Sequence, residues 1–322
     1  MNRNVLFALM AAALFGASTP FAKLLVGSMP PVMLAGLLYL GSGLGLALIR
    51  LVRDRGWQAS GLTRAEWPWL LGAVFFGGVA GPVALMFGLL TTSGSSASLL
   101  LNLEAVLTAV IAWVIFKENA DKRIVLGMVA IVAGGVALSW PEQNTRNVNW
   151  LGPVLVCVAC LCWAIDNNLT RKVSASDALY IASSKGIMAG LVNTLLALSL
   201  GATLPSTAII LEAMAVGLLG YGFSLVLFVL ALRGLGTART GAYFSTAPFV
   251  GALISLLVFG ESTSPQFWLA VLLMGIGVWL HLTEKHAHEH EHGPLDFEHT
   301  LSHSKVRHSH KHFPDIYHRH EH

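Results

Sequence analysis

The sequence predicts an all-α polytopic membrane protein, with about ten transmembrane helices arranged as two inverted five-helix repeats. Three observations lead to this fold class. The composition is strongly apolar, the apolar residues form continuous runs long enough to cross a bilayer as helices, and the second half of the chain repeats the pattern of the first. A soluble enzyme fold is not expected from such a chain.

The composition separates this chain from soluble globular proteins. Hydrophobic residues make up 55% of the 322 residues and charged residues only 11%, whereas charged residues average about 25% in soluble proteins. Most charges lie in short breaks between apolar runs of about 18–22 residues, the length that crosses the hydrocarbon core as a helix. Because these runs are continuous rather than alternating, they exclude an outer-membrane barrel.

The first apolar run, residues 5–25, follows Arg3 and resembles a signal peptide in its length. We interpret it as a membrane helix, because a second run begins at once near Val32 and no soluble domain follows. Hydropathy gives about ten spans in all. Their expected bounds are 4–25, 32–52, 68–90, 95–116, 123–140, 150–169, 178–200, 208–232, 238–259 and 266–283.

An internal repeat relates the two halves of the chain. When the sequence is shifted by about 143 positions, residues 115–118 fall on 258–261 and residues 87–103 fall on 230–246 without a gap. A glycine-rich apolar run follows residues 115–118, and another follows residues 258–261. Because five spans per half is an odd number, the second half must enter the membrane in the opposite direction. This predicts inverted repeats with a site between them.

The basic residues predict the orientation. With the N-terminus in the cytoplasm, the internal loops contain Arg50, Arg53, Arg55, Arg64, Lys117, Lys122, Arg123, Arg171, Lys172, Arg233 and Arg239. The external loops then hold Arg146 alone, with Lys23 near an external helix end. This asymmetry follows the positive-inside rule. We therefore expect a multi-pass protein of the cytoplasmic (inner or plasma) membrane, with both termini in the cytoplasm.

Short motifs make the repeats more specific. Lys117-Glu118 and Gly260-Glu261 each end a helix ahead of a glycine-rich span. Pro248 lies in the apolar stretch before the second of these acids. The opening segment 14–18, Leu-Phe-Gly-Ala-Ser, is matched by segment 162–166, Cys-Trp-Ala-Ile-Asp, at a slightly larger shift.

In these motifs the chain resembles the EamA family of the drug/metabolite transporter superfamily, over residues 1–283. The resemblance implies one EamA repeat at 1–140, a second at 150–283, and transport of amino acids, metabolites or drugs, mostly outward, rather than enzyme activity. The remaining residues, 284–322, form a histidine-rich tail. In one respect the chain departs from the family: the second helix of a repeat often carries a basic residue, and here only the second repeat has one, Lys185.

Glu104 is the first candidate for a coupling or binding acid. It lies about ten residues into the fourth span, roughly 15 Å at helical rise, and therefore near the midplane. Asn102 lies beside it in the sequence. Because ionisable groups at this depth are costly and mark functional sites, we interpret Glu104 as a proton or cation site, or as the acid that binds a substrate amine. The alternative is a buried acid paired with a base on a neighbouring helix.

Asp166 and Lys185 form a candidate pair on adjacent spans. Asp166 lies about 7 Å from the end of the sixth span and Lys185 about 10 Å from the start of the seventh, so their depths are similar. They are either a structural ion pair or a gate or binding pair on the cytosolic side. Asn167 adds a donor and an acceptor beside them, and Trp163 lies near enough to line a cavity.

Glu118 and Glu261 lie at helix C-terminal ends, where a carboxylate is unfavourable against the helix dipole. We expect a compensating group, such as the backbone N–H groups of the next helix start or a nearby cation. We therefore interpret both acids, together with Pro248, as structural residues of the repeat rather than as transport ligands.

All 13 histidines of the chain lie at or after His281. The alternating ones are His286, His288, His290, His292, His308, His310, His312, His318, His320 and His322. Imidazoles at this spacing suit Zn, Ni or Co, although no cofactor is required. Such a polar, low-complexity segment predicts a disordered cytosolic tail in the absence of metal. The histidines also suit a pH sensor.

The sequence favours a secondary transporter, because it contains no phosphate-binding loop. We expect export of small metabolites, amino acids or drugs by alternating access, with metal or pH regulation through the tail. Two alternatives stay open: a Zn, Ni or Co exporter whose tail collects the metal, and a membrane-bound metal or pH sensor without transport. The expected partners are a small-molecule solute, the lipid bilayer and divalent metal ions, but no nucleic acid. The protein is a monomer or a homodimer.

Overall fold

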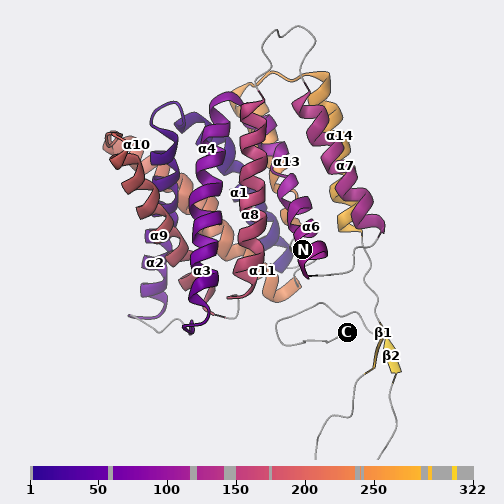
Figure 1. Ribbon diagram of the computed structural model, residues 1–322, viewed down its shortest axis with the longest axis horizontal. Helices are drawn as coiled ribbons and strands as arrows, with labels where there is room; N and C mark the ends of the chain where they lie inside the picture. Colours follow the sequence, from indigo (N-terminus) through magenta and orange to yellow (C-terminus); the bar gives the residue numbers. More distant parts are fainter. Residues whose placement is uncertain are drawn as a thin grey trace, which may run out of the picture.

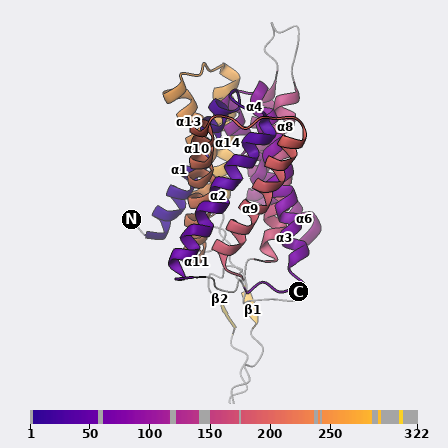
Figure 2. The same ribbon diagram turned by 90° about the vertical axis from the view of Figure 1, so that its left-hand side faces the viewer.

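A computed structural model shows how the chain folds. It describes residues 3–56, 61–116, 122–140, 150–173, 176–235, 240, 243–283, 289–291 and 307–309. The described helices stand side by side in one bundle (Figures 1 and 2). Their bounds are α1 Arg3–Leu25, α2 Pro31–Arg53, α3 Trp67–Ala73, η1 Val74–Ala80, α4 Gly81–Thr91, α5 Gly94–Leu100, α6 Leu103–Phe116, α7 Lys122–Ser139, α8 Leu151–Arg171, α9 Ala178–Ser199, α10 Thr207–Gly217, η2 Leu218–Phe223, α11 Ser224–Leu235, α13 Ala247–Phe259 and α14 Pro265–Leu282.

The predicted membrane spans correspond to helices of this bundle. Eight described helices are long and apolar enough to cross a membrane, and α13 and α14 are shorter apolar helices. Pro31–Arg53 and Ala178–Ser199, for example, lie within a few residues of the spans predicted at 32–52 and 178–200. The all-α polytopic class is therefore confirmed for the part of the chain that the structure describes.

The fourth span is not one continuous helix. It divides at a turn formed by Leu101 and Asn102, between α5 and α6. The Asn102 side chain donates a hydrogen bond from Nδ2 to the carbonyl of Leu99, at 2.9 Å. A polar side chain that bonds to nearby backbone in this way competes with the helical pattern. We expected an unbroken span at 95–116, and the break instead places Glu104 in the first turn of a new helix.

The second repeat contains a matching break. A turn at Ser245 and Thr246 comes directly before α13. Thr246 donates from Oγ1 to the carbonyl of Tyr243, at 2.7 Å, as Asn102 does to Leu99 in the first repeat. Pro248 then lies in the first turn of α13, where its missing N–H is not needed. Each repeat therefore has a turn directly before a helix, at α6 in the first repeat and at α13 in the second.

A second irregularity also occurs once in each repeat. The third span passes through the π-helical segment η1 between α3 and α4, and the eighth passes through η2 between α10 and α11. These segments begin at Val74 and Leu218, which are equivalent in the internal repeat to within one residue. Short π-helical segments often mark functional positions in α-helices. In this chain η1 forms one wall of the site described below.

Two apolar clusters form the core of the bundle. The larger one joins α1, α2, α4, α5 and α8, and the smaller one joins α5, α6, α7, α13 and α14. Close helix contacts pass through glycines: on α2, a Cβ at Gly43 would overlap Ile187 of α9, and on α1, a Cβ at Gly16 would overlap Ala247 of α13. Small residues allow helix backbones to approach in this way.

Charged residues tie α2 to α9 at one end of the bundle. Asp177 is the N-cap of α9 and accepts from the backbone N–H of Leu179, at 2.9 Å. The same carboxylate accepts hydrogen bonds from Arg50 Nε, at 3.1 Å, and from Arg53 at 2.6 Å. The end of α2 and the start of α9 therefore lie on one face of the bundle. The inverted repeat predicts this arrangement.

The part of the tail that the structure describes consists of two short strands. Strand β1, Glu289–Glu291, pairs with strand β2, Arg307–Ser309, in antiparallel register with His290 opposite His308. The strands lie outside the helical bundle (Figure 1). We expected no regular structure in residues 284–322. Pairing the two strands provides partners for backbone groups that a single extended segment would leave to water.

Candidate functional site

Asp166 on α8 and Lys185 on α9 form an ion pair inside the bundle. Lys185 Nζ donates to the two carboxylate oxygens of Asp166, at 2.5 and 2.8 Å. Thr170, one turn further along α8, donates to Asp166 Oδ1 at 2.9 Å and lies 3.2 Å from Lys185 Nζ. Asp166 is only 8% exposed. The two residues that the sequence paired by depth are thus in direct contact.

The π-helical segment η1 supports this ion pair. A Cβ at Gly77 would overlap the carboxylate of Asp166, so the absence of a side chain there lets the acid lie against the backbone. The carbonyl of Gly77 accepts hydrogen bonds from Tyr39 Oη, at 2.5 Å, and from Trp163 Nε1, at 3.0 Å. The next carbonyl, of Gly78, accepts from Asn193 Nδ2 at 2.9 Å. Helices α2, α8 and α9 therefore all bind the backbone of η1.

A second carboxylate lies on the other side of α8. Glu104, in the first turn of α6, accepts a hydrogen bond from Asn167 Nδ2, at 2.9 Å. Asn167 also lies 3.5 Å from the hydroxyl of Thr108. Because Asp166 and Asn167 are consecutive, α8 directs one toward α9 and the other toward α6. Glu104 is half-buried and Asn167 is exposed, so this side of the site is open to its surroundings.

Aromatic rings from both repeats lie next to these polar groups. Phe15 on α1 contacts Trp163, with ring centroids 6.5 Å apart, and Tyr221 of η2, at 6.0 Å. Phe15 also contacts Phe244 at 5.3 Å. Tyr39 stacks on Tyr221 at 5.5 Å. The cluster thus brings an apolar surface from both halves of the chain to the ion pair. We call these five side chains the aromatic cluster.

Asn102, which the sequence grouped with Glu104, belongs to a different environment. Its side chain is 3% exposed, and its amide donates to Leu99 at the helix break and lies 3.8 Å from Met274 Sδ. We assign it to the interruption between α5 and α6. It positions Glu104 through the backbone, since α6 begins at Leu103 and Glu104 is its second residue.

Glu261 and Glu118 were interpreted together from the sequence. Glu261 accepts hydrogen bonds from the backbone N–H groups of Gly94 and Ser95, both at 2.8 Å. These two N–H groups offset the unfavourable position of the carboxylate after a helix end. They belong to the start of α5, in the other repeat. Glu118 lies outside the described residues.

Most of the tail histidines also lie outside the described residues: His286, His288, His292, His310, His312, His318, His320 and His322. His290 and His308 face each other across the two short strands. Within the described part of the chain, no group of three or more His, Cys, Asp or Glu side chains is placed to hold a metal ion.

Three contributors to the site were missed by the sequence reasoning. Thr170 had a usable signal, because it lies four residues after Asp166 on the same helix and therefore on the same face. Gly77 had a weaker signal, since its spacing to Gly81 indicates a close helix contact, and the hydroxyl of Tyr39 had none. Their roles depend on how η1 packs against α2 and α8, which local sequence does not reveal.

Comparison with known proteins agrees with this architecture. The profile of the EamA-like transporter family matches residues 2–140 and 150–283. An uncharacterized transporter of Methanothermobacter thermautotrophicus is 28% identical over 288 residues, covering 84% of this chain and 83% of the relative. The uncharacterized transporter YyaM of Bacillus subtilis is 26% identical and covers 79% of this chain and 86% of the relative. One solved crystal structure matches with a TM-score of 0.63 and 16% identity, over 86% of this chain and 94% of that chain, which shows the fold alone.

Proposed function

The chain belongs to the EamA-like transporter family, and from that premise we propose that it is a secondary exporter of small metabolites, amino acids or drugs. It is a multi-pass membrane protein, related to proteins named as transporters. The finer proposal places it in the cytoplasmic membrane with both termini in the cytosol, and has it work by alternating access between the two repeats. We infer transport rather than enzyme catalysis.

The observation that carries the proposal is that α8 presents Asp166 to Lys185 on one face and Asn167 to Glu104 on the next face. Asp166 has a cation within 2.5 Å, namely Lys185. Among the described residues, the carboxylate of Glu104 has one hydrogen-bond partner, the neutral amide of Asn167. With both acids ionised, this group of three side chains carries a net negative charge, which is costly inside a membrane. A proton or a cationic group of the solute at Glu104 neutralises it.

This arrangement suits coupling between a proton and a solute. Glu104 holds a proton in one state and releases it when an ammonium group of the solute takes its place, with Asn167 orienting the carboxylate. The aromatic cluster packs against the apolar part of the solute, and Lys185 and Thr170 offer donors to its polar groups. An amphipathic solute with polar and apolar parts fits this combination.

The charged residues at the helix ends support the proposed orientation. Asp166 lies near the end of α8, and α8 ends on the face where α2 ends and α9 begins. That face carries Arg50 and Arg53, and the positive-inside rule therefore favours a cytosolic position for it. The exposed side of Asn167 then gives solute from the cytosol a route to Glu104, in agreement with outward transport.

A transition-metal cation is the second candidate solute. The tail histidines favour it, since imidazole binds Zn, Ni and Co. In this alternative the tail collects the metal in the cytosol and passes it to Glu104 and Asp166. A third candidate is a membrane-bound metal or pH sensor, in which the tail binds the signal and the helices no longer transport. In either exporter the tail also suits regulation by metal or pH.

One experiment separates these three functions. Cells carry the wild-type chain, Glu104→Gln, Glu212→Gln, or a chain stopped before His286, and mass spectrometry measures metabolites in the medium and total cellular zinc, nickel and cobalt. Metabolites released by wild type and Glu212→Gln, but not by Glu104→Gln, support the proposal. Glu212 is the control because it is an exposed acid on α10. Cellular metal that falls only when Glu104 is intact makes the protein a metal exporter. Unchanged metabolites and metal in every strain contradict both transport functions.

A further inference from the structure

Glu261 joins the two repeats at the face of the bundle opposite to Arg50 and Arg53. It follows α13 directly, and its two carboxylate oxygens accept from the backbone N–H groups of Gly94 and Ser95, each at 2.8 Å. These are the first two residues of α5. A carboxylate at a helix start is stabilised by the free N–H groups and by the helix dipole. The contact is therefore a strong connection between segments more than a hundred residues apart.

Lys23 adds a second connection at the same place. It lies in the last turn of α1, and its Nζ donates to the carbonyl of Leu89 near the end of α4. Its positive charge also interacts with Glu261. The ends of α1, α4 and α13 and the start of α5 are thus held together by two charged side chains.

Beneath these charges, α5 packs against α13 through small residues. A Cβ at Gly94 would lie 2.8 Å from Ser255 Oγ, and a Cβ at Gly251 would lie 2.6 Å from Ser98 Oγ. Ser98 and Ser255 are 1% and 0% exposed, and neither hydroxyl has a hydrogen-bond partner among the described residues. Burying a hydroxyl without a partner costs free energy. Separation of α5 from α13 lets water bind both hydroxyls and recovers that cost.

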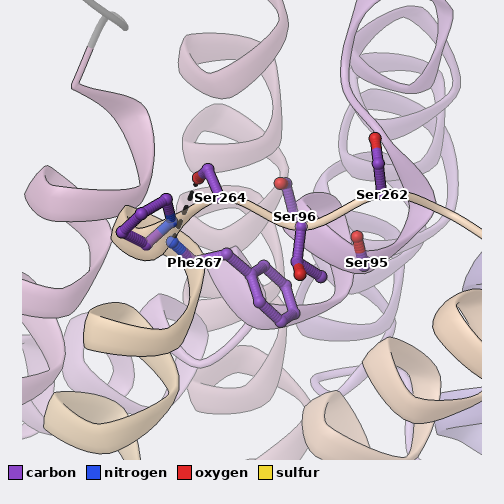
Figure 3. Close-up of a pocket in the computed structure, with 7 residues that line it drawn as sticks. Ser95, Ser96, Ser262, Ser264 and Phe267 are labelled. Carbon is purple, nitrogen blue, oxygen red and sulfur yellow. Dashed lines mark hydrogen bonds between the residues drawn. The ribbon is translucent and has the colours of Figure 1, made fainter.

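A polar pocket lies directly outside this contact (Figure 3). It has a volume of about 390 Å³ and is lined by Ser95, Ser96, Ser262, Thr263, Ser264, Pro265 and Phe267. Ser264 accepts from the backbone N–H of Phe267 and so caps α14, while Ser95 and Ser96 belong to the first turn of α5. The pocket therefore lies between the two segments that Glu261 joins, at the outer end of the α5–α13 contact.

We propose that Glu261 is the latch of a gate between α5 and α13, and that the serine-lined pocket is the vestibule into which this gate opens. In the state seen here the latch is closed, and Ser98 is sealed inside. Release of Glu261 from the start of α5 allows the two helices to part, and the unpartnered hydroxyls of Ser98 and Ser255 become hydrated. The gate serves the alternating access proposed above and rests on that function, whereas the labelling rates test the latch itself without a solute.

Thiol labelling of a Ser98→Cys protein in nanodiscs tests the latch, because both faces of the bundle are then open to a maleimide. Peptide mass spectrometry reads each site separately, and native Cys160, 0% exposed, reports general loosening. Glu261→Gln removes the charge and leaves one acceptor oxygen, so we expect labelling at position 98 to become about tenfold faster. The matched control, Glu212→Gln, removes an exposed acid and leaves the rate unchanged.

A second variant keeps the test decisive if Glu261→Gln loosens the whole protein and Cys160 labels faster as well. Ser95→Pro removes one of the two N–H donors in the first turn of α5, where proline is tolerated. It leaves Glu261 untouched. Faster labelling at position 98, with Cys160 still protected, supports the latch. Unchanged labelling at position 98 in Ser95→Pro, or in a folded Glu261→Gln protein, overturns it.

Discussion

The rings of Phe15 and Trp163 meet edge to face, with centroids 6.5 Å apart and planes inclined by 70°. The internal repeat equates these two residues, since segment 14–18 matches segment 162–166. Residues that are equivalent in two repeats and also touch each other must lie near the pseudo-two-fold axis. The aromatic cluster is therefore at the centre of the molecule, where transporters with inverted repeats bind their solutes.

Replacing only one member of the Asp166–Lys185 ion pair should destabilise the protein. Asp166→Asn leaves a buried ammonium without its carboxylate, and such a loss typically destabilises a protein by about 3–5 kcal/mol. We expect a large fall in the melting temperature of the detergent-purified protein, measured by fluorescence-detected size exclusion. Lys185→Met should give a fall of similar size.

The double variant Asp166→Asn/Lys185→Met distinguishes a structural pair from a functional one. Because it removes both charges, it should recover most of the lost melting temperature. We expect metabolite release to stay absent, since Lys185 is assigned a role with the solute. Full release by the stable double variant would make the pair purely structural.

Gly77 should tolerate no side chain. A Cβ there overlaps the carboxylate of Asp166, so Gly77→Ala must push Asp166 away from Lys185 or bend η1. We expect lower yield and a lower melting temperature, by an amount typical of overpacking, about 1–3 kcal/mol. The control is Gly275→Ala in α14, where no described atom beyond the adjoining turns of the same helix lies within 4 Å of the added Cβ. Equal stability of the two variants would contradict the close packing of Asp166 on η1.

Tyr39 and Trp163 donate to the same carbonyl, of Gly77, so their losses should not add. Tyr39→Phe and Trp163→Phe each leave the other donor in place. Tyr39→Phe should cost about 1 kcal/mol or less, and Trp163→Phe should cost more because it also removes buried ring volume. The double variant leaves the carbonyl without either side-chain donor and should cost more than the sum of the two single variants. A double-mutant cycle of unfolding free energies in detergent measures this. Strict additivity would show that the two hydrogen bonds are independent.

Low pH should remove the contribution of the ionised Asp177 carboxylate to the stability of the folded protein. Partial burial raises the pKa of Asp177, but the hydrogen bonds from Arg53 and Arg50 outweigh it and hold the pKa below its usual range. Since the folded pKa is lowered, the stabilisation is complete above the ordinary pKa of about 4 and is lost as the pH falls through the lowered value.

The measurement compares the melting temperatures of wild type and Asp177→Asn at neutral pH and in acid. Asparagine keeps the helix cap but loses the charge, so the variant should melt lower at neutral pH. The difference should shrink as the pH falls below about 4. A difference that stays constant as the pH falls would contradict a contribution from the ionised carboxylate.

Much of this fold was predictable because membrane helices are specified by long apolar runs. Within a few residues, those runs located the described spans, and the repeat predicted that α2 ends on the face where α9 begins. The breaks were not predictable from hydropathy. The turn at Leu101 and Asn102 and the segments η1 and η2 lie within apolar runs, and they depend on side-chain bonds to the backbone and on packing between helices.

A contact of the site was predictable where depth in the membrane alone decides which residues lie close together. Asp166 and Lys185 were paired because their depths on adjacent spans match. The contact of Glu104 with Asn167 was not foreseen, since it requires the break that turns α6 toward α8. Similarly, a need for compensation was evident at Glu261, but its partner, the start of α5, is far away in the sequence. Such contacts depend on how each helix is rotated about its own axis. An almost wholly apolar sequence contains few polar positions from which that rotation could be predicted.

Solute-driven proton movement in proteoliposomes tests whether Glu104 is the coupling acid. The solute is the metabolite whose release the cell experiment identifies, and a pH-sensitive dye inside the vesicles reports protons. We expect this solute to drive proton movement through wild type and Glu212→Gln, and we expect Glu104→Gln to insert normally but to move no protons. Proton movement through Glu104→Gln at the wild-type rate would rule out Glu104 as the coupling acid.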